Sequence, residues 1–150
     1  MTAVCSPIDG VAASLAGVPD EVFASGMVGA GLAVVPSAEG VMDVAAPVAG
    51  KVMRIMPHAL VIMTPENRGV LVHVGIDTVH MKGEGFMVHA AKKDRVEVGD
   101  VLITADVAAI RAAGHDPICP VVIMESVAED IGDVAAPGTP VAMGDPLFLA

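Results

Sequence analysis

Residues 57–74 read Pro57-His-Ala-Leu-Val-Ile-Met-Thr-Pro-Glu-Asn-Arg-Gly-Val-Leu-Val-His-Val74. Two runs of β-favouring residues, 59–63 and 70–74, lie on either side of a segment rich in turn-forming residues. This pattern predicts a β-hairpin. In the second run valine occupies every second position, so we expect the valines to face a core and His73 to face away from it.

The length of the loop decides whether a second histidine, His58, shares a face with His73. If residues 64–67 form the loop, His58 lies directly opposite His73. If the loop is 64–69, His73 faces Leu60 and His58 is one diagonal step away. A five-residue loop would put the two imidazoles on opposite faces of the hairpin. Joint action of the two histidines is therefore expected only with an even loop.

The remainder of the chain is also typical of β structure. Short apolar runs recur between glycine and proline residues, at 52–55, 101–103 and 121–124. Helical signals are confined to one turn at 19–23 and two turns at 106–113, ahead of Gly114. The sequence predicts an all-β fold, an antiparallel sandwich or barrel with one or two very short helices.

Two internal echoes indicate a duplicated β motif. Ser6-Pro-Ile-Asp-Gly-Val11 resembles Ala46-Pro-Val-Ala-Gly-Lys51, since each is a Pro-x-x-Gly turn that leads into an apolar run. Val96-Glu-Val-Gly-Asp-Val-Leu102 resembles Pro140-Val-Ala-Met-Gly-Asp-Pro-Leu147, where a Gly-Asp turn separates two short strands. No linker-like segment divides the chain, so we expect a single domain over residues 1–150.

Composition limits the classes of function. The 150 residues are 54% hydrophobic, enough for a core without disulfides or a structural metal. No apolar run reaches the roughly 18 residues of a membrane span, and residues 1–7 lack the basic start of a secretory signal. We therefore expect a cytoplasmic protein with no membrane insertion. Its two cysteines, Cys5 and Cys119, are expected to be unpaired thiols.

The formal charge of −10 argues against nucleic acid as a partner, because nucleic-acid binding needs a basic face. The chain also has no Trp or Tyr on which bases could stack. An acidic surface suits a protein partner that presents a basic patch.

Two imidazoles side by side are compatible with several roles. A neutral imidazole nitrogen is a nucleophile near pH 7, and a second imidazole can donate a hydrogen bond to an incoming phosphoryl group. The same pair could bind zinc with a third ligand, for which Asp77, His80 and Glu84 are nearby candidates. A purely structural pair is the third possibility. The residues alone leave all three open.

The sequence from Gly69-Val-Leu-Val-His-Val-Gly-Ile-Asp-Thr-Val-His-Met-Lys-Gly-Glu-Gly-Phe86 closely resembles the signature of glucose-type enzyme IIA. These proteins belong to the bacterial phosphoenolpyruvate-dependent sugar phosphotransferase system. The resemblance covers nearly the whole chain. It extends to segments 6–10, 19–29, 46–50, 58–59, 96–100 and 120–123 in the same order.

This resemblance implies a β-sandwich with a duplicated hybrid motif and a phosphotransferase activity without a cofactor or a metal. His73 would accept a phosphoryl group on Nε2 from the histidine-containing phosphocarrier protein. It would then pass the group to a cysteine of a IIB domain, for uptake of a sugar of the glucose or N-acetylglucosamine class. The protein would work in the cytoplasm, transiently at the inner face of the membrane through its permease partner.

The resemblance also implies roles for other residues. His58 matches the second active-site histidine, which supports transfer. Gly75 supplies the carbonyl that holds Nδ1 of the nucleophile, and Asp77 matches an acidic residue on the rim that meets the donor. An exposed apolar patch for docking would consist of the three residues Phe23, Val28 and Leu60.

Some positions depart from the family pattern. Met56 stands where a threonine often holds the supporting histidine, Ala30 replaces an aspartate, and His80 replaces a glutamate. Two alternatives from other classes remain. One is a zinc-dependent hydrolase of similar β architecture. The other is a regulatory module that docks on protein targets without transferring a phosphoryl group.

Overall fold

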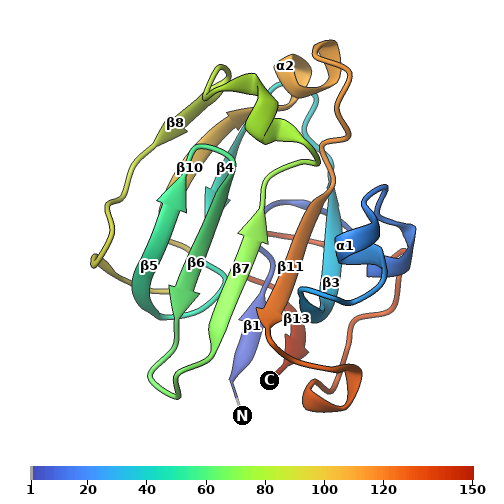
Figure 1. Cartoon of the computed structure of the whole chain (residues 1–150), viewed down its shortest axis with the longest axis vertical. Coiled ribbons are helices and arrows are strands. Elements are labelled where there is room, and N and C mark those ends of the chain that lie inside the picture. Colours follow the sequence, from blue (N-terminus) through green and yellow to red (C-terminus); the bar gives the residue numbers. More distant parts are fainter. Residues whose placement is uncertain (1) are drawn as a thin grey trace.

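The computed structural model describes residues 2–150. Figure 1 shows a curled arrangement of antiparallel strands with very little helix, as the sequence predicts. The strands are β1 (Ala3–Cys5), β2 (Gly10–Ala13), β3 (Gly29–Pro36), β4 (Val41–Ala45), β5 (Gly50–Met56), β6 (Ala59–Met63), β7 (Gly69–His73), β8 (Phe86–Val88), β9 (Arg95–Val96), β10 (Val101–Asp106), β11 (Cys119–Met124), β12 (Pro140–Val141) and β13 (Pro146–Leu149).

The helical segments are short. They are η1 (Leu15–Gly17), α1 (Glu21–Ala24), η2 (Thr78–Met81), α2 (Val107–Ala112) and η3 (Ala128–Asp130). Asp20 and Asp106 cap α1 and α2 by accepting hydrogen bonds from backbone N–H groups. Gly114, with φ of 84°, follows α2. Both short helices were predicted. No helix among the described residues is long and apolar enough to cross a membrane.

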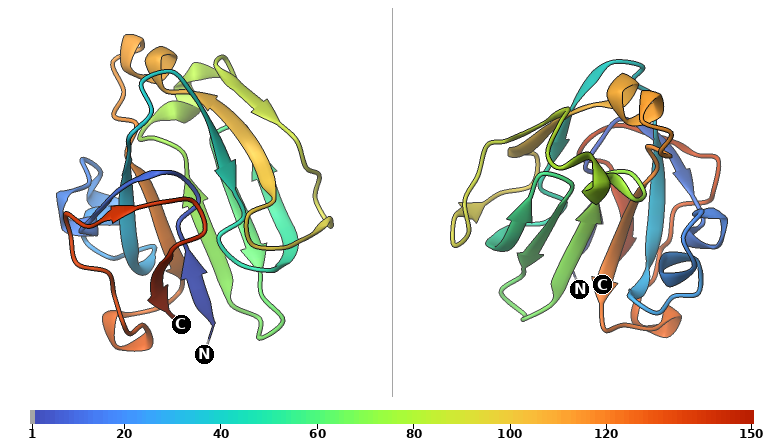
Figure 2. Two further views of the ribbon diagram at one scale, coloured as in Figure 1. Left: turned by 180° about the vertical axis from the view of Figure 1, so that it is seen from behind. Right: turned by 45° about the horizontal axis from the view of Figure 1, so that its top comes forward.

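The strands form three sheets. The largest has the order β12-β2-β3-β11-β7-β6-β5-β9, a second has β4-β10-β8, and β1 pairs with β13. Figure 2 shows how the large sheet curls around the smaller ones. Strand β7 lies in the middle of the large sheet, between β11 and β6. The strand that carries His73 is therefore held on both sides.

The duplicated motif is visible in the strand pairing. In the first copy Gly10 of β2 pairs with Val141 of β12, and in the second copy Gly50 of β5 pairs with Val96 of β9. At each glycine the backbone of the next strand approaches closely, so that a Cβ atom would lie about 2 Å from a carbonyl oxygen. The repeated Pro-x-x-Gly spacing thus places a glycine, in both copies, where the neighbouring strand leaves no room for a side chain.

The two copies are joined by matching hydrogen bonds across the centre of the molecule. The Ala45 N–H donates to the Pro7 carbonyl, and the Cys5 N–H donates to the Pro47 carbonyl, each at 2.8 Å. The two Pro-x-x-Gly segments and the residues just before them therefore satisfy each other's backbone groups, and the four residues that form these two bonds are buried.

The hairpin of β6 and β7 forms, but its register differs from both predicted ones. Met63 pairs with Gly69 and Ala59 with His73, which leaves a five-residue loop, 64–68. Within that loop the Thr64 hydroxyl accepts a hydrogen bond from the Arg68 N–H (3.1 Å), and the Asn67 N–H donates to the Thr64 carbonyl (3.0 Å). These bonds close the five-residue turn, the one loop length from which the sequence predicted that the two imidazoles would lie on opposite faces.

The main core lies between the large sheet and the two smaller ones. The valines of β7 and the segment after it, Val70, Val72 and Val74, are fully buried there, as predicted from their alternation. A second, smaller cluster of buried residues contains Val18, Phe23, Ala33, Ile76, Ile118 and Val122. It supports the segment that follows His73. Both cysteines are buried free thiols.

Candidate active site

His58 and His73 lie against each other despite the five-residue loop. Their ring centroids are 5.3 Å apart and their planes meet at 67°. The prediction that an odd loop would separate the imidazoles was wrong, because His58 is not part of β6. It lies in the two-residue turn between β5 and β6, where strand alternation does not fix the direction of a side chain. The His58 carbonyl still accepts a hydrogen bond from the Val74 N–H (2.7 Å).

His73 is held in one orientation by its own chain. Its Nδ1 atom forms a hydrogen bond with the carbonyl oxygen of Gly75, two residues further on. Because a carbonyl oxygen only accepts, the hydrogen of the neutral ring is on Nδ1 and the free lone pair is on Nε2. The geometry thus leaves Nε2 as the ring nitrogen with an unshared lone pair.

The backbone conformation of Gly75 makes this contact possible. Its φ is 78°, a left-handed value that side chains disfavour, and a Cβ atom would lie 2.6 Å from Cγ2 of Thr78 and 3.2 Å from the Asp116 carbonyl oxygen. That carbonyl accepts a hydrogen bond from the Ile76 N–H (2.8 Å), and the Thr78 hydroxyl donates to the Val74 carbonyl (2.7 Å). These bonds lock the turn on both sides of Gly75.

Thr78 and Asp116 were not singled out from the sequence. Asp116 acts through its backbone, and Thr78 is a buried hydroxyl four residues beyond the carbonyl to which it donates. A hydroxyl so soon after a glycine turn is a signal for such a bond. The role of Asp116 could not be predicted from the sequence, because every residue has a backbone carbonyl.

Burial lowers the pKa of His73 below the ordinary value of 6.5. The Gly75 carbonyl and the carboxylates of Asp20 and Asp77 oppose that shift without cancelling it. Burial also lowers the pKa of His58, and the nearby His73 lowers it further. Both rings are therefore neutral at pH 7, the state in which an imidazole is a nucleophile. As the pH falls below 6.5, these two histidines bind protons more readily in the unfolded chain than in the folded one. The folded state is therefore destabilised by acid below this pH, and above it the two groups do not change its stability.

Phe23 is a second ring in contact with His73. Its ring centroid is 5.4 Å from that of His73, with an interplanar angle of 63°. It reaches His73 from α1, whose N-cap is Asp20. Asp77 is exposed on the rim at the start of η2. The partly buried imidazole of His73 thus lies near the carboxylates of Asp20 and Asp77, which favour its protonated form.

The expected docking patch is not exposed as predicted. Leu60 is fully buried (0% exposed), because it lies opposite Val72 on the core face of the hairpin. A role for Leu60 in docking is therefore wrong. Phe23 is 7% exposed, and Val28 is half-buried against the same small cluster.

Other apolar side chains on the elements around the site are open to solvent. Val22 on α1 is 47% exposed and Val79 on η2 is 52% exposed, while Met27 in the loop after α1 reaches 78%. These three residues, and not Leu60, provide the exposed apolar surface of the elements that carry the site. Large exposed apolar side chains near a functional group are typical of docking surfaces.

Two departures from the family pattern have visible consequences. Met56 is half-buried, and its sulfur contacts the Arg54 guanidinium (3.8 Å) and not His58. No hydrogen bond from residues 2–150 holds the His58 ring. Its position depends on the turn and on packing against His73. The Ala30 N–H donates a hydrogen bond to the Ser126 hydroxyl (3.0 Å). The Ala30 side chain is a methyl group, so this position adds no charge.

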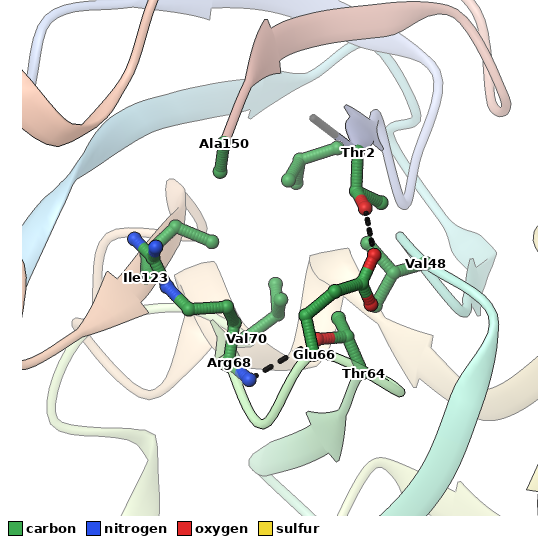
Figure 3. A pocket seen from close by; sticks show the side chains of 9 residues that line it. Thr2, Val48, Thr64, Glu66, Arg68, Val70, Ile123 and Ala150 are labelled. Carbon is green, nitrogen blue, oxygen red and sulfur yellow. Dashed lines mark hydrogen bonds between the residues drawn. The ribbon is translucent and has the colours of Figure 1, made fainter.

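His58 and His73 have no third His, Cys, Asp or Glu side chain beside them that is placed to hold a metal ion in the described part of the chain. Across residues 2–150 there is no group of three or more His, Cys, Asp or Glu side chains placed to hold a metal ion. A distinct pocket of about 280 Å³ lies at the other end of β7, near Val70 and Ile123 (Figure 3). Thr2 donates a hydrogen bond to Glu66 at its rim (2.9 Å). This pocket does not contain either histidine of the pair.

Comparison with known families identifies the chain. Residues 2–128 match the family model described as phosphoenolpyruvate-dependent sugar phosphotransferase system, EIIA 1. The chain belongs to this family.

Similar proteins have names from the same phosphotransferase system. The chain is 38% identical to the "PTS system glucose-specific EIIA component" of Halalkalibacterium halodurans over 122 residues, which cover 80% of this chain and 69% of that protein. It is 47% identical over 115 residues to the "PTS system glucose-specific EIICBA component" of Streptococcus pneumoniae, covering 75% of this chain but only 15% of that much longer protein.

A solved structure has the same fold. The glucose permease IIA from Mycoplasma capricolum superimposes with a TM-score of 0.85 at 31% identity, over 97% of this chain and 93% of that one. The predicted fold class and the predicted family are therefore both confirmed.

The coupling between the two histidines can be measured by titration. In the wild-type chain, NMR should show both imidazoles titrating below pH 6.5. In His73→Gln the pKa of His58 should rise, because the second ring no longer opposes its protonation. It should stay below 6.5, because burial remains the larger cause. An unchanged His58 titration in that variant would contradict the proximity of the rings.

A matched pair of glycine variants tests the turn that holds His73. Gly75→Ala and Gly114→Ala both force a left-handed residue to carry a Cβ, at a cost of about 1–2 kcal/mol each in unfolding free energy. Only at Gly75 would that Cβ press on neighbouring atoms, since a Cβ at Gly114 would meet nothing within 4 Å. Gly75→Ala should therefore be the less stable variant, and it alone should change the ¹⁵N signals of His73. Equal effects on those signals would be evidence against the role of the Gly75 carbonyl.

Proposed function

We propose that this enzyme IIA carries a phosphoryl group on Nε2 of His73. The histidine-containing phosphocarrier protein would be the donor and a cysteine of a IIB domain the acceptor. The observation that supports this most strongly is the hydrogen bond between Nδ1 of His73 and the Gly75 carbonyl. It leaves one nitrogen free to attack and does so before any partner arrives.

The transfer step balances without a cofactor. The lone pair of Nε2 attacks the phosphorus of the donor's phosphohistidine, and the new N–P bond forms as the donor's N–P bond breaks. The Nδ1 hydrogen stays in its bond to the Gly75 carbonyl, whose oxygen stabilises the positive charge that phosphorylation places on the ring. The IIB cysteine thiolate then attacks the same phosphorus and releases His73 unchanged.

His58 is suited to support this step. Its ring lies 5.3 Å from that of His73, close enough to donate a hydrogen bond to a phosphoryl oxygen on Nε2. Since the described residues provide no hydrogen bond to hold it, its alignment would be completed when the phosphoryl group enters.

The charge of the surface favours the proposed partners. Asp20 and Asp77 lie near His73, and the whole chain has a formal charge of −10. A donor with a basic face would be attracted over a distance and oriented on contact. Phe23 and Val28, with the exposed Val22, Met27 and Val79, would provide the apolar part of the interface.

The wider setting follows from the relatives. Glucose-specific names among them favour a sugar of the glucose or N-acetylglucosamine class. Fused EIICBA proteins carry an enzyme IIA segment in the same chain as their IIB and IIC parts, which supports a IIB domain as the acceptor. We infer a single domain over residues 1–150 that acts in the cytoplasm and meets the membrane through its permease.

Transfer of labelled phosphate separates the roles of the two histidines. With phosphoenolpyruvate, enzyme I and the donor carrier, the wild-type chain should gain one acid-labile phosphoryl group, and His73→Ala should gain none. His58→Gln should still accept it but pass it to a IIB domain more slowly, by up to about 10²-fold, because the imidazole donor is replaced by an amide N–H of different reach and acidity. His89→Gln is the control, because His89 bonds Thr104 outside the site and should behave as wild type.

Two results would contradict the proposal. One is a His73→Ala variant that is phosphorylated as well as the wild type. The other is a wild-type chain that binds the donor carrier but gains no phosphoryl group, which would favour a docking module without transfer.

A further inference from the structure

A second pair of histidines lies outside the proposed transfer site. His80 on η2 and His115 after α2 have ring centroids 6.4 Å apart and an interplanar angle of 32°. They come from segments far apart in the sequence that meet beside α2, near the top of Figure 1. Nothing in their spacing along the sequence links positions 80 and 115.

The two rings line one hollow. It has a volume of about 770 Å³ and is formed by η2, the turn after it and the C-terminal half of α2. The α2 side of its lining is made of small residues, Ala109, Ala112 and Ala113, and the imidazoles and the Glu84 carboxylate are the strongest ligand groups among the residues that line it. Lys82 also lines the hollow, and Glu84 offsets its charge.

We propose that His80 and His115 form a chelating site for a divalent transition metal that prefers imidazole, such as Zn²⁺, Ni²⁺ or Cu²⁺. Two imidazoles that bind one zinc ion through nitrogens at about 2.0–2.1 Å place their ring centres roughly 5 to 6 Å apart. The observed 6.4 Å is close to this range, and His80 is exposed and free to rotate toward His115. Water would complete the coordination, because the described residues offer no third ligand already in place.

Such a metal would join the two segments that hold Gly75. His80 lies on η2, two residues after Thr78. His115 precedes Asp116, whose carbonyl accepts a hydrogen bond from the Ile76 N–H. The ion would link the two sides of that turn from outside and stabilise it. The site uses neither His58 nor His73 and stands independently of the proposed transfer reaction.

Residue-resolved NMR tests this site directly. Adding Ni²⁺ or Cu²⁺ to the ¹⁵N-labelled chain should broaden the signals around residues 80 and 115. The same titration in His80→Ala and in His115→Ala should show binding there weakened by more than about tenfold, since even indirect ligand contacts are worth about 10–100-fold. His89→Ala, which removes an exposed histidine bonded to Thr104, is the control and should leave the broadening unchanged.

The competing pair His58 and His73 gives distinct outcomes. Broadening at both pairs supports the proposal if the part around residues 80 and 115 disappears in His80→Ala. The proposal is overturned by broadening confined to the surroundings of His58 and His73. It is also overturned by broadening around residues 80 and 115 that survives both alanine variants. Zinc calorimetry on the same variants should give the same order of affinities.

Discussion

The contact between Nδ1 of His73 and the Gly75 carbonyl is the constraint on which the site depends. It fixes the tautomer and the orientation of the ring, and it requires a left-handed residue two positions after the histidine. The neighbouring hydrogen bonds of the Thr78 hydroxyl and the Asp116 carbonyl hold that residue in place. The chemistry of one nitrogen atom is thus decided by backbone geometry and not by a neighbouring charge.

The fold supplies a rigid base for this short turn. Strand β7 ends at His73 in the middle of an eight-stranded sheet, and the valines on its other face are fully buried. The two copies of the β motif close the rest of the molecule through reciprocal hydrogen bonds between their Pro-x-x-Gly segments. If His73 is the nucleophile we propose, its place at the end of a central strand would keep the entropy lost on partner docking small, because the strand is already ordered.

Much of this could be read from the sequence, and the failures have physical causes. Alternating valines placed His73 on the outer face, and the Gly-Asp echoes predicted the duplication. The loop length was wrong because the Thr64 hydroxyl closes a turn that residue type alone does not reveal. His58 reaches His73 from a turn, where a period of two does not apply. Leu60 was misplaced because similarity to an exposed position ignored the register that buries it.

We propose that Nε2 of His73 carries the phosphoryl group because its Nδ1 is held by the Gly75 carbonyl. Two-dimensional NMR of the ¹⁵N-labelled chain after phosphorylation, with ³¹P coupling to the ring nitrogens, assigns the modified atom. We expect ³¹P coupling to Nε2 of His73, while its Nδ1 keeps a hydrogen. Coupling to Nδ1, or to a nitrogen of any other histidine, would contradict it.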